Sequence, residues 1–390
     1  MLPLLAPPLL AGAVGYALYR AYRKMEGPDL SGFDVEPPLF RDGDRNSAGL
    51  ATVNAYLVEN FIKPAQAANA TTGWEDKRER FEQAGLARTD CVAEYRDDYI
   101  DVDGHRLHGR WTLVDGHDPD QRILYLHGGA FTVGSDVSHR PLTWNLAKRT
   151  GAAVFAPNYR LMPENARRDS IVDARAAYRW ILENGPDGPA PAASVGVAGD
   201  SAGGNLTLML SNHVRDEGLR PPDAVYAISP SVDSTAASPT FKGNLDTDLM
   251  LQPLLRPLVR VPRALLLMGM RKQTGINPSD PDISPVFADL SGLPPTLVQV
   301  SSSEMLYGDA LRYANKANAD GSDVSLQAWS HMPHVFPIFD DVLDEAKDAL
   351  DEAGAFFIEH GVGRTQAGQA KRKPAKRKSK QRGTAKPESA

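Results

Sequence analysis

The segment 197-VAGDSAGGN-205 places Ser201 between two glycines on what reads as a tight bend. An apolar run ends just before it and a helical pattern begins just after it, so Ser201 falls between a predicted strand and a predicted helix. The spacing G-x-S-x-G is typical of a serine nucleophile on a sharp strand-to-helix turn, although the spacing alone is a weak signal. A serine hydroxyl is a poor nucleophile, so it needs a base, an acid that orients the base, and donors for an oxyanion.

The donors are sought in the segment 127-HGGAF-131, which directly follows the predicted strand 123–126. Two consecutive glycines allow a loop to direct bare N–H groups into a site, so we predict Gly128 and Gly129 as donors. The N–H of Ala202 is the predicted third donor, because it lies at the N-terminus of a helix, where negative charge is favoured.

The base and the acid are expected late in the chain. The segment 329-WSHMPHVFPIF-339 follows the last predicted strand and contains His331 and His334. The segment 301-SSSEMLYGD-309 follows the strand before it and contains Glu304 and Asp309. We favour Glu304, because Asp309 is expected on the following helix as a solvated carboxylate.

Short apolar runs alternate with longer helical patterns from about residue 97 onward. The predicted strands are 123–126, 153–156, 195–198, 224–228, 296–300 and 324–329. Helical patterns such as 171–184 and 206–218 lie between them. This alternation predicts an α/β fold with a mostly parallel central sheet and helices on both faces. Sites in such sheets form at the carboxyl ends of the strands, where the segments above are expected to meet.

The remaining segments suggest a cap around this core. Residues 26–46 read as a linker, and residues 47–96 as N-terminal cap helices with apolar residues at helical spacing. The catalytic domain is expected at 97–361, interrupted at 236–275 by an apolar, proline-broken insertion that could form a lid. The composition is ordinary for a globular protein, with 42% hydrophobic and 24% charged residues. The single cysteine, Cys91, excludes an internal disulfide and is expected to be a small buried apolar residue.

Both ends of the chain differ in composition from the domain between them. Residues 2–19 contain no charge, and Arg20, Arg23 and Lys24 follow, which predicts an N-terminal membrane anchor (residues 1–25) with the catalytic domain on the cytoplasmic side. A secretory signal peptide, and hence a secreted protein, is the alternative. Residues 362–390 carry ten Lys and Arg against one Glu and are expected to be a disordered basic tail. The tail could contact anionic lipid, but nucleic acid is not an expected partner because no aromatic residue is interleaved.

Several of these segments together resemble the hormone-sensitive lipase family of α/β-hydrolases, in its G-D-S-A-G branch. The resemblance covers about residues 97–345 and rests on 127-HGGAF-131, 158-NYRLMPE-164, 199-GDSAGGN-205, 283-ISPVFADLSGLPPTLVQV-300 and 332-MPHVF-336. It implies an α/β-hydrolase fold with a helical cap, and a serine esterase that needs no metal or cofactor. It also implies Ser201 as nucleophile, His334 rather than His331 as base, and an oxyanion hole formed by Gly128, Gly129 and Ala202.

The sequence departs from the family pattern at three places. Ala130 stands where a third glycine is common, and Glu304 stands where the acid is usually aspartate. The segment 165-NARRDS-170 replaces the usual His and prolines, so that loop is expected to be reshaped, whereas Glu164 is expected to hold a loop in place.

The prediction is therefore a carboxylic ester hydrolase acting on a small-molecule ester, with a short to medium acyl chain, or on a lipid-like ester. An amidase or peptidase with the same triad is one alternative. A non-catalytic ligand-binding member of the fold, or a membrane-tethered scaffold, is another. The sequence does not indicate an oligomeric state.

Overall fold

The structure is a computed structural model that describes residue 16 and residues 19–67 and 73–364. An eight-stranded sheet runs through its centre in the order β1-β2-β4-β3-β7-β8-β9-β10. The strands are β1 (Glu94–Val102), β2 (His105–Leu113), β3 (Asp118–Leu126), β4 (Ala152–Pro157), β7 (Ser194–Asp200), β8 (Ala224–Ile228), β9 (Thr296–Ser301) and β10 (Val324–Trp329). A separate short hairpin pairs β5 (Asn184–Gly185) with β6 (Gly188–Pro189).

All neighbours from β4 to β10 in this order are parallel, whereas β1 pairs with β2, and β2 with β4, in antiparallel fashion. The six strands predicted from apolar runs are all present, and each prediction falls within β3, β4, β7, β8, β9 or β10. The central strands read clearly because every residue of β4, β7, β8 and β9 is buried. The predicted α/β fold with a mostly parallel sheet is therefore confirmed.

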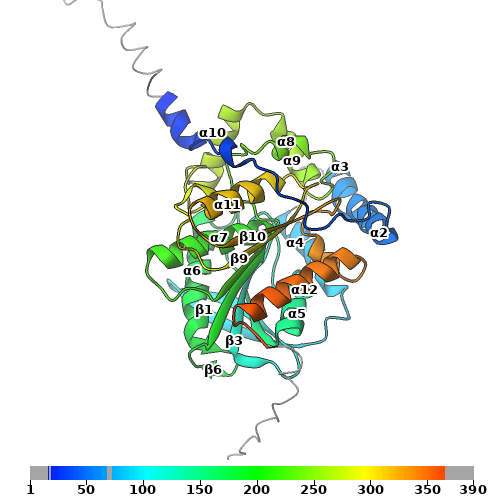
Figure 1. The fold of residues 1–390 in the computed structure, drawn as a ribbon, viewed down its shortest axis with the longest axis vertical. Helices are drawn as coiled ribbons and strands as arrows, with labels where there is room; N and C mark the ends of the chain where they lie inside the picture. Colours follow the sequence, from blue (N-terminus) through cyan, green and yellow to red (C-terminus); the bar gives the residue numbers. More distant parts are fainter. Residues whose placement is uncertain (1–15, 17–18, 68–72, 365–390) are drawn as a thin grey trace, which may run out of the picture.

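Helices cover both faces of the sheet (Figure 1). One face is covered by α6 (Arg167–Glu183), α7 (Ser201–Asp216) and α11 (Tyr307–Ala319). The other is covered by α5 (Arg140–Thr150) and α12 (Asp344–Glu359), whose apolar residues pack on β3, β4 and β8. Because the strands from β4 to β10 are parallel, their carboxyl ends lie at one edge of the sheet.

The segments predicted as cap and insertion lie together in the fold. The N-terminal ones form α2 (Ala48–Leu57), a π-helical turn η2 (Val58–Ile62), α3 (Lys63–Ala67) and α4 (Trp74–Leu86). The insertion between β8 and β9 forms α8 (Thr240–Gly243), α9 (Gln252–Val259) and α10 (Arg263–Thr274). The helix α9 contacts both η2 and α3, so the two segments meet, as Figure 1 also shows. Short 3-10 turns complete the fold at η1 (Ser31–Phe33), η3 (Pro285–Phe287) and η4 (Phe336–Phe339).

The segment 26–46, read from the sequence as a linker, is packed along α11 and β10. Asp34 forms two short contacts with the guanidinium of Arg312, at 2.6 and 2.8 Å. Farther along, the amide of Phe40 donates to the carbonyl of Ala328, at 2.8 Å. The segment 26–46 therefore lies against the end of β10 and is not a free linker.

The membrane anchor predicted for residues 2–19 is not supported. Within the described ranges no helix is long and apolar enough to cross a bilayer, and residues 1–15, 17 and 18 lie outside those ranges. The part that is described, the helix at 19–26, has four charged residues among its eight, and Met25 is buried against the protein. The predicted localisation through an N-terminal anchor is therefore corrected, and neither a transmembrane helix nor the membrane as partner is supported by the described residues.

The C-terminal tail is described only to Arg364. Val362 is buried, and Arg364 forms an ion pair with Asp118. Residues 365–390, which contain the rest of the predicted basic tail, lie outside the described residues. The prediction for Cys91, the one cysteine of the sequence, is confirmed, because its side chain is buried.

Candidate active site

Ser201 is the first residue of α7 and follows directly on the last residue of β7. Its φ of 51° is a left-handed conformation that non-glycine residues rarely adopt, and strain of this kind gathers at functional sites. A β-carbon on Gly203 would lie 1.9 Å from the carbonyl oxygen of Leu126, and one on Gly199 would lie 2.6 Å from the same oxygen. Both glycines are therefore required for this turn to pack against the end of β3.

The structure brings Ser201, His334 and Glu304 together, although they follow three different strands, β7, β10 and β9. His334 Nε2 is 2.9 Å from Ser201 Oγ, and His334 Nδ1 is 2.6 Å from Glu304 Oε2. With Glu304 ionised, Nδ1 donates to the carboxylate and Nε2 is free to accept the proton of Ser201. His334 is 2% exposed and Glu304 is fully buried, so water does not weaken their interaction.

Glu304 is held by two further donors that the sequence did not reveal. Its Oε1 accepts from Ser229 Oγ at 2.9 Å and from the amide of Ser301 at 2.7 Å. The same Ser229 hydroxyl accepts from the amide of Val335, at 3.2 Å. Ser229 follows β8 directly, so the one available signal was its place at the same edge of the sheet. These bonds fix the carboxylate in the plane where it meets His334.

The buried pair shifts the titration of both groups. Burial by itself lowers the pKa of His334, but the hydrogen bond and charge of Glu304 outweigh it and raise the pKa above its usual value. Burial raises the pKa of Glu304, although the hydrogen bond and charge of His334 oppose this. The net result is a histidine whose protonated form is stabilised beside Ser201 Oγ, an arrangement that can support proton abstraction from that hydroxyl.

The predicted oxyanion donors fall into two groups. The amides of Gly129 and Ala202 form no hydrogen bond within the described part of the chain, and neither does that of Ala130. Gly129 has a φ of 115°, and its β-carbon would lie 2.1 Å from the carbonyl oxygen of Val133, so only glycine fits there. Ala202 lies in the first turn of α7, where backbone N–H groups have no helical partner.

The amide of Gly128 is engaged elsewhere. It donates to Asp200 Oδ1 at 2.9 Å and lies 3.2 Å from His139 Nε2. Its expected role as an oxyanion donor therefore does not fit the geometry. Glycine is nevertheless required at this position, because a β-carbon would lie 2.1 Å from Asp200 Oδ2.

Asp200 is the centre of a buried polar network that the sequence reading missed. It also accepts from the Tyr125 hydroxyl at 2.7 Å, and its Oδ2 is 3.4 Å from His139 Nε2. Burial alone raises the pKa of Asp200, but the charge of His139 and these hydrogen bonds outweigh it and lower the pKa. The only sequence signal was its place next to Ser201. The network ties the oxyanion loop to the residue that precedes the nucleophile.

The other candidate residues lie away from the triad. His331 is 41% exposed, and its Nε2 is 3.8 Å from Asp42. Asp309 is buried rather than solvated, and its carboxylate accepts from the amides of Val232 and Asp233 at 3.2 and 3.1 Å. It therefore supports the loop after β8.

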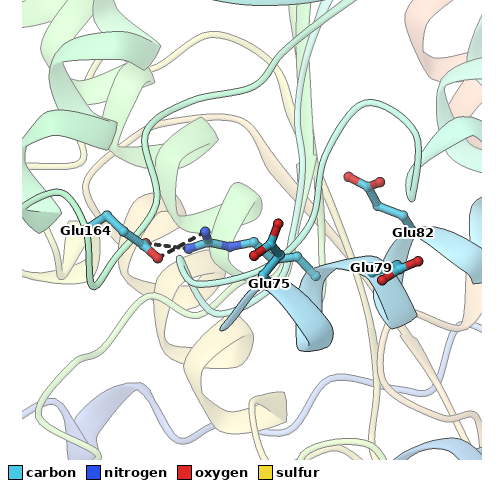
Figure 2. Close-up of a pocket in the computed structure, with 5 residues that line it drawn as sticks. Glu75, Glu79, Glu82 and Glu164 are labelled. Carbon is cyan, nitrogen blue, oxygen red and sulfur yellow. Dashed lines mark hydrogen bonds and ion pairs between the residues drawn. The ribbon is translucent and has the colours of Figure 1, made fainter. Parts of the chain in front are cut away.

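Glu164 joins a loop to the cap. Its carboxylate receives two hydrogen bonds from Arg78 of α4, the shorter of 2.7 Å, and Arg78 also donates to the carbonyl of Thr132 at 2.9 Å. Arg78 and Glu164 both line a hollow of about 450 Å³, and Figure 2 shows Glu164 there opposite Glu75, Glu79 and Glu82. The hollow is lined by Glu75, Arg78, Glu79, Glu82 and Glu164, and so by none of the triad residues.

The mostly parallel eight-stranded sheet with helices on both faces is the architecture of an α/β hydrolase. Residues 123–338 match a family described as alpha/beta hydrolase fold. An acetyl-hydrolase of Streptomyces hygroscopicus is 37% identical over 235 residues, which make up 60% of this chain and 74% of that protein. An ethyl acetate hydrolase of Pseudomonas putida is 29% identical over 319 residues, which make up 78% of this chain and 94% of that protein.

The chain is also similar to solved structures of esterases. The crystal structure of an esterase from the bacterial hormone-sensitive lipase family matches with a TM-score of 0.67 and 32% identity, over 81% of this chain and 99% of that chain. The chain therefore belongs to the α/β hydrolase fold family, and within it to the hormone-sensitive lipase-like esterases. Its class is that of the carboxylic ester hydrolases.

Proposed function

We propose that the protein hydrolyses carboxylic esters through a Ser201-His334-Glu304 triad and an acyl-enzyme intermediate. One observation supports this most directly: His334 lies 2.9 Å from Ser201 Oγ and 2.6 Å from Glu304. These are hydrogen-bonding distances for a nucleophile, its base and the acid that orients the base.

In the first half of the reaction, Ser201 Oγ attacks the ester carbonyl while His334 Nε2 takes its proton. Glu304 holds the imidazole in the tautomer that accepts at Nε2 and stabilises the imidazolium that forms. The tetrahedral intermediate then collapses, the bond to the alcohol oxygen breaks, and His334 returns the proton to that oxygen. The alcohol leaves and the acyl group remains on Ser201.

In the second half, water replaces the alcohol. His334 takes a proton from the water as its oxygen attacks the acyl carbon, and the bond to Ser201 Oγ breaks as that proton passes to Ser201. The carboxylic acid is released and the free enzyme is restored. Both halves pass through an oxyanion, so both depend on the same amide donors.

For the oxyanion hole we propose the amides of Gly129, Ala130 and Ala202. Gly129 and Ala202 were expected in this role, and Ala130 takes the place expected for Gly128, whose amide is bonded to Asp200. Removing one donor of this kind typically costs about 3–4 kcal/mol of transition-state stabilisation. The departure from a third glycine at Ala130 is compatible with this role, because an alanine amide donates equally well.

For the substrate we propose an ester with a short acyl chain. The relatives that support this are an acetyl-hydrolase and an ethyl acetate hydrolase. The lipid-like ester considered from the sequence was motivated in part by the N-terminal anchor, which is not supported. Amide hydrolysis uses the same triad and differs in the protonation of the leaving nitrogen, so it remains an outcome for experiment to decide.

The test is a set of p-nitrophenyl esters from acetate to dodecanoate, together with the matching acetyl anilide. We expect the highest kcat/KM on the shortest esters, with little turnover of the anilide. The Ser201→Ala variant should lose both turnover and labelling by a fluorophosphonate probe. Turnover that persists in Ser201→Ala would exclude the proposed triad, and a maximum at dodecanoate would replace the short-chain substrate by a lipid-like one.

A further inference from the structure

Arg167, the first residue of α6, is a buried cation in an unusual setting. It is 2% exposed, and its Nη1 and Nη2 donate to Ser170 Oγ at 2.8 Å and to Asn205 Oδ1 at 2.7 Å. Both acceptors are neutral, and no ion pair of Arg167 occurs among the described residues, although many of the other arginines form one. Burial lowers its pKa to about 10.

Stability does not explain an arginine at this position. A buried charge without a carboxylate partner loses hydration that neutral acceptors only partly replace. Even a buried ion pair can often be replaced by apolar residues of similar volume without loss of stability. An arginine in such a place therefore points to a role in the site rather than in the core.

The guanidinium contacts the loop that bears two of the proposed oxyanion donors. Its central carbon lies 3.7 Å from the centroid of the Phe131 ring, a cation–π contact between a buried guanidinium and a partly buried ring. Phe131 directly follows Ala130, and the two residues have φ values of 61° and 51°. Two successive non-glycine residues in the left-handed region persist only where their surroundings impose that conformation.

The same guanidinium contacts the helix that bears the third donor. Asn205, its partner, lies one turn after Ser201 on α7. The Asn205 amide group donates onward to the carbonyls of Ser231 at 2.6 Å and Ile283 at 2.9 Å, so this partner is itself fixed. Arg167 thus bridges two separate elements whose amides must converge on one oxygen atom.

We propose that Arg167 is a positioning residue that holds the strained 130–131 turn and the start of α7 in register, so that the amides of Gly129, Ala130 and Ala202 converge on the oxyanion. The role rests on the proposed function, because it acts on that oxyanion hole. Since the substrate binds before the oxyanion forms, loss of this register lowers kcat and leaves KM nearly unchanged.

The experiment compares Arg167→Met with Arg175→Met. Arg175 is a matched control because it lies on the same helix and pairs with Asp282, and among the described residues no hydrogen bond joins it to Phe131, Asn205 or a triad residue. With p-nitrophenyl acetate, we expect Arg167→Met to lower kcat about 10-fold with KM within about 2-fold. We expect its melting temperature to stay close to that of the wild type, because the loss of two hydrogen bonds opposes the removal of a buried charge that has no carboxylate partner. Arg175→Met should keep the wild-type kcat.

A double-mutant cycle with Phe131→Leu tests whether Arg167 affects kcat through its contact with the Phe131 ring. The cycle remains decisive if Arg167→Met is less stable than expected. If Arg167 acts through the ring, the fall in kcat caused by Arg167→Met becomes much smaller when Phe131 is already leucine. An undiminished fall would overturn the role, as would a wild-type kcat in Arg167→Met. Arg167→Lys should recover part of kcat, because it restores the charge without the planar stacking group.

The outcomes separate this role from the proposed function. A wild-type protein that hydrolyses the ester, with Ser201→Ala inactive and Arg167→Met unaffected, overturns only the role of Arg167. A wild-type protein without ester hydrolysis overturns both.

Discussion

His334 Nδ1 and Glu304 Oε2 are 2.6 Å apart, and both side chains are almost wholly shielded from water. The two residues are 30 positions apart in the chain and lie on the loops after β10 and β9. Their side chains meet because these strands are adjacent and parallel, so that the loops after them leave the same edge of the sheet.

This pair predicts the pH dependence of hydrolysis. The base must be neutral to act, and the hydrogen bond and charge of Glu304 raise the pKa of His334. Replacing Glu304 by Gln removes the charge, so the pKa of His334 falls and the acid limb of the kcat/KM profile moves to lower pH. The plateau should also fall, by about 10³- to 10⁴-fold, because the tautomer is no longer held.

The control for this profile is Asp309→Asn. Asp309 is a buried acid near the same strand, but it accepts from the amides of Val232 and Asp233 and does not contact His334. The acid limb of the kcat/KM profile of Asp309→Asn should therefore lie at the same pH as that of the wild type. A limb that moves to higher pH in Glu304→Gln would contradict the assignment of Glu304 as the partner of His334.

The choice between the two late histidines gives a second prediction. His334→Ala should lower kcat by at least about 10⁴-fold, since removal of the base disables the triad as a unit. His331→Ala should stay within about 3-fold of the wild type, since an exposed side chain of this kind contributes little to function or stability. Steady-state kinetics on one ester, with circular dichroism to confirm folding, decides between them. Equal losses in the two variants would be inconsistent with the site described above.

The close approach at Gly203 gives a third prediction, on stability. Gly203→Ala would place a methyl group 1.9 Å from the Leu126 carbonyl oxygen, and the backbone on both sides is fixed. We expect a loss of at least about 1–3 kcal/mol in the free energy of unfolding, as for other overpacked interiors. Gly32→Ala is the matched control, because its methyl group would meet open space. Urea denaturation of the two variants measures the difference, and similar midpoints would show that the turn can relax.

The thiol of Cys91 gives a fourth prediction. Its side chain is buried, and burial raises its pKa to about 12. At pH 8 the native protein should therefore react with a disulfide reagent at least about 100-fold more slowly than after denaturation, when the thiolate is accessible. The denatured chain should release one equivalent, which serves as the internal control. Rapid reaction of the native protein would mean that this part of the fold opens readily.

The sequence predicted the centre of the sheet better than its edge. The strands β3, β4, β7, β8, β9 and β10 were found because they are short apolar runs between helices. The strands β1 and β2 were missed, because many of their side chains are polar and at least partly exposed. Asp103 and Gly104, both with positive φ, form the turn between them, and this Asp-Gly pair was the available hairpin signal.

The hydrophobic pattern at the N-terminus was misleading for a different reason. An uncharged stretch followed by basic residues is typical of an anchor, but length and hydropathy are necessary rather than sufficient for one. The described residues that follow it form a charged helix beside α10, where Glu26 pairs with Arg263 at 3.3 Å. Pairing of this kind depends on residues more than two hundred positions away, which no local pattern contains.

The sequence by itself determined the chain order of the proposed reacting groups. Ser201, Glu304 and His334 each follow a readable strand, and the geometry of parallel strands requires such positions to share one edge. Only the tertiary structure decided which backbone amides remain free there. The Gly128 amide turns toward Asp200, 72 residues away, and leaves Gly129, Ala130 and Ala202 as the unbonded donors. A glycine-rich loop can adopt many conformations, and the side chains packed around it select one.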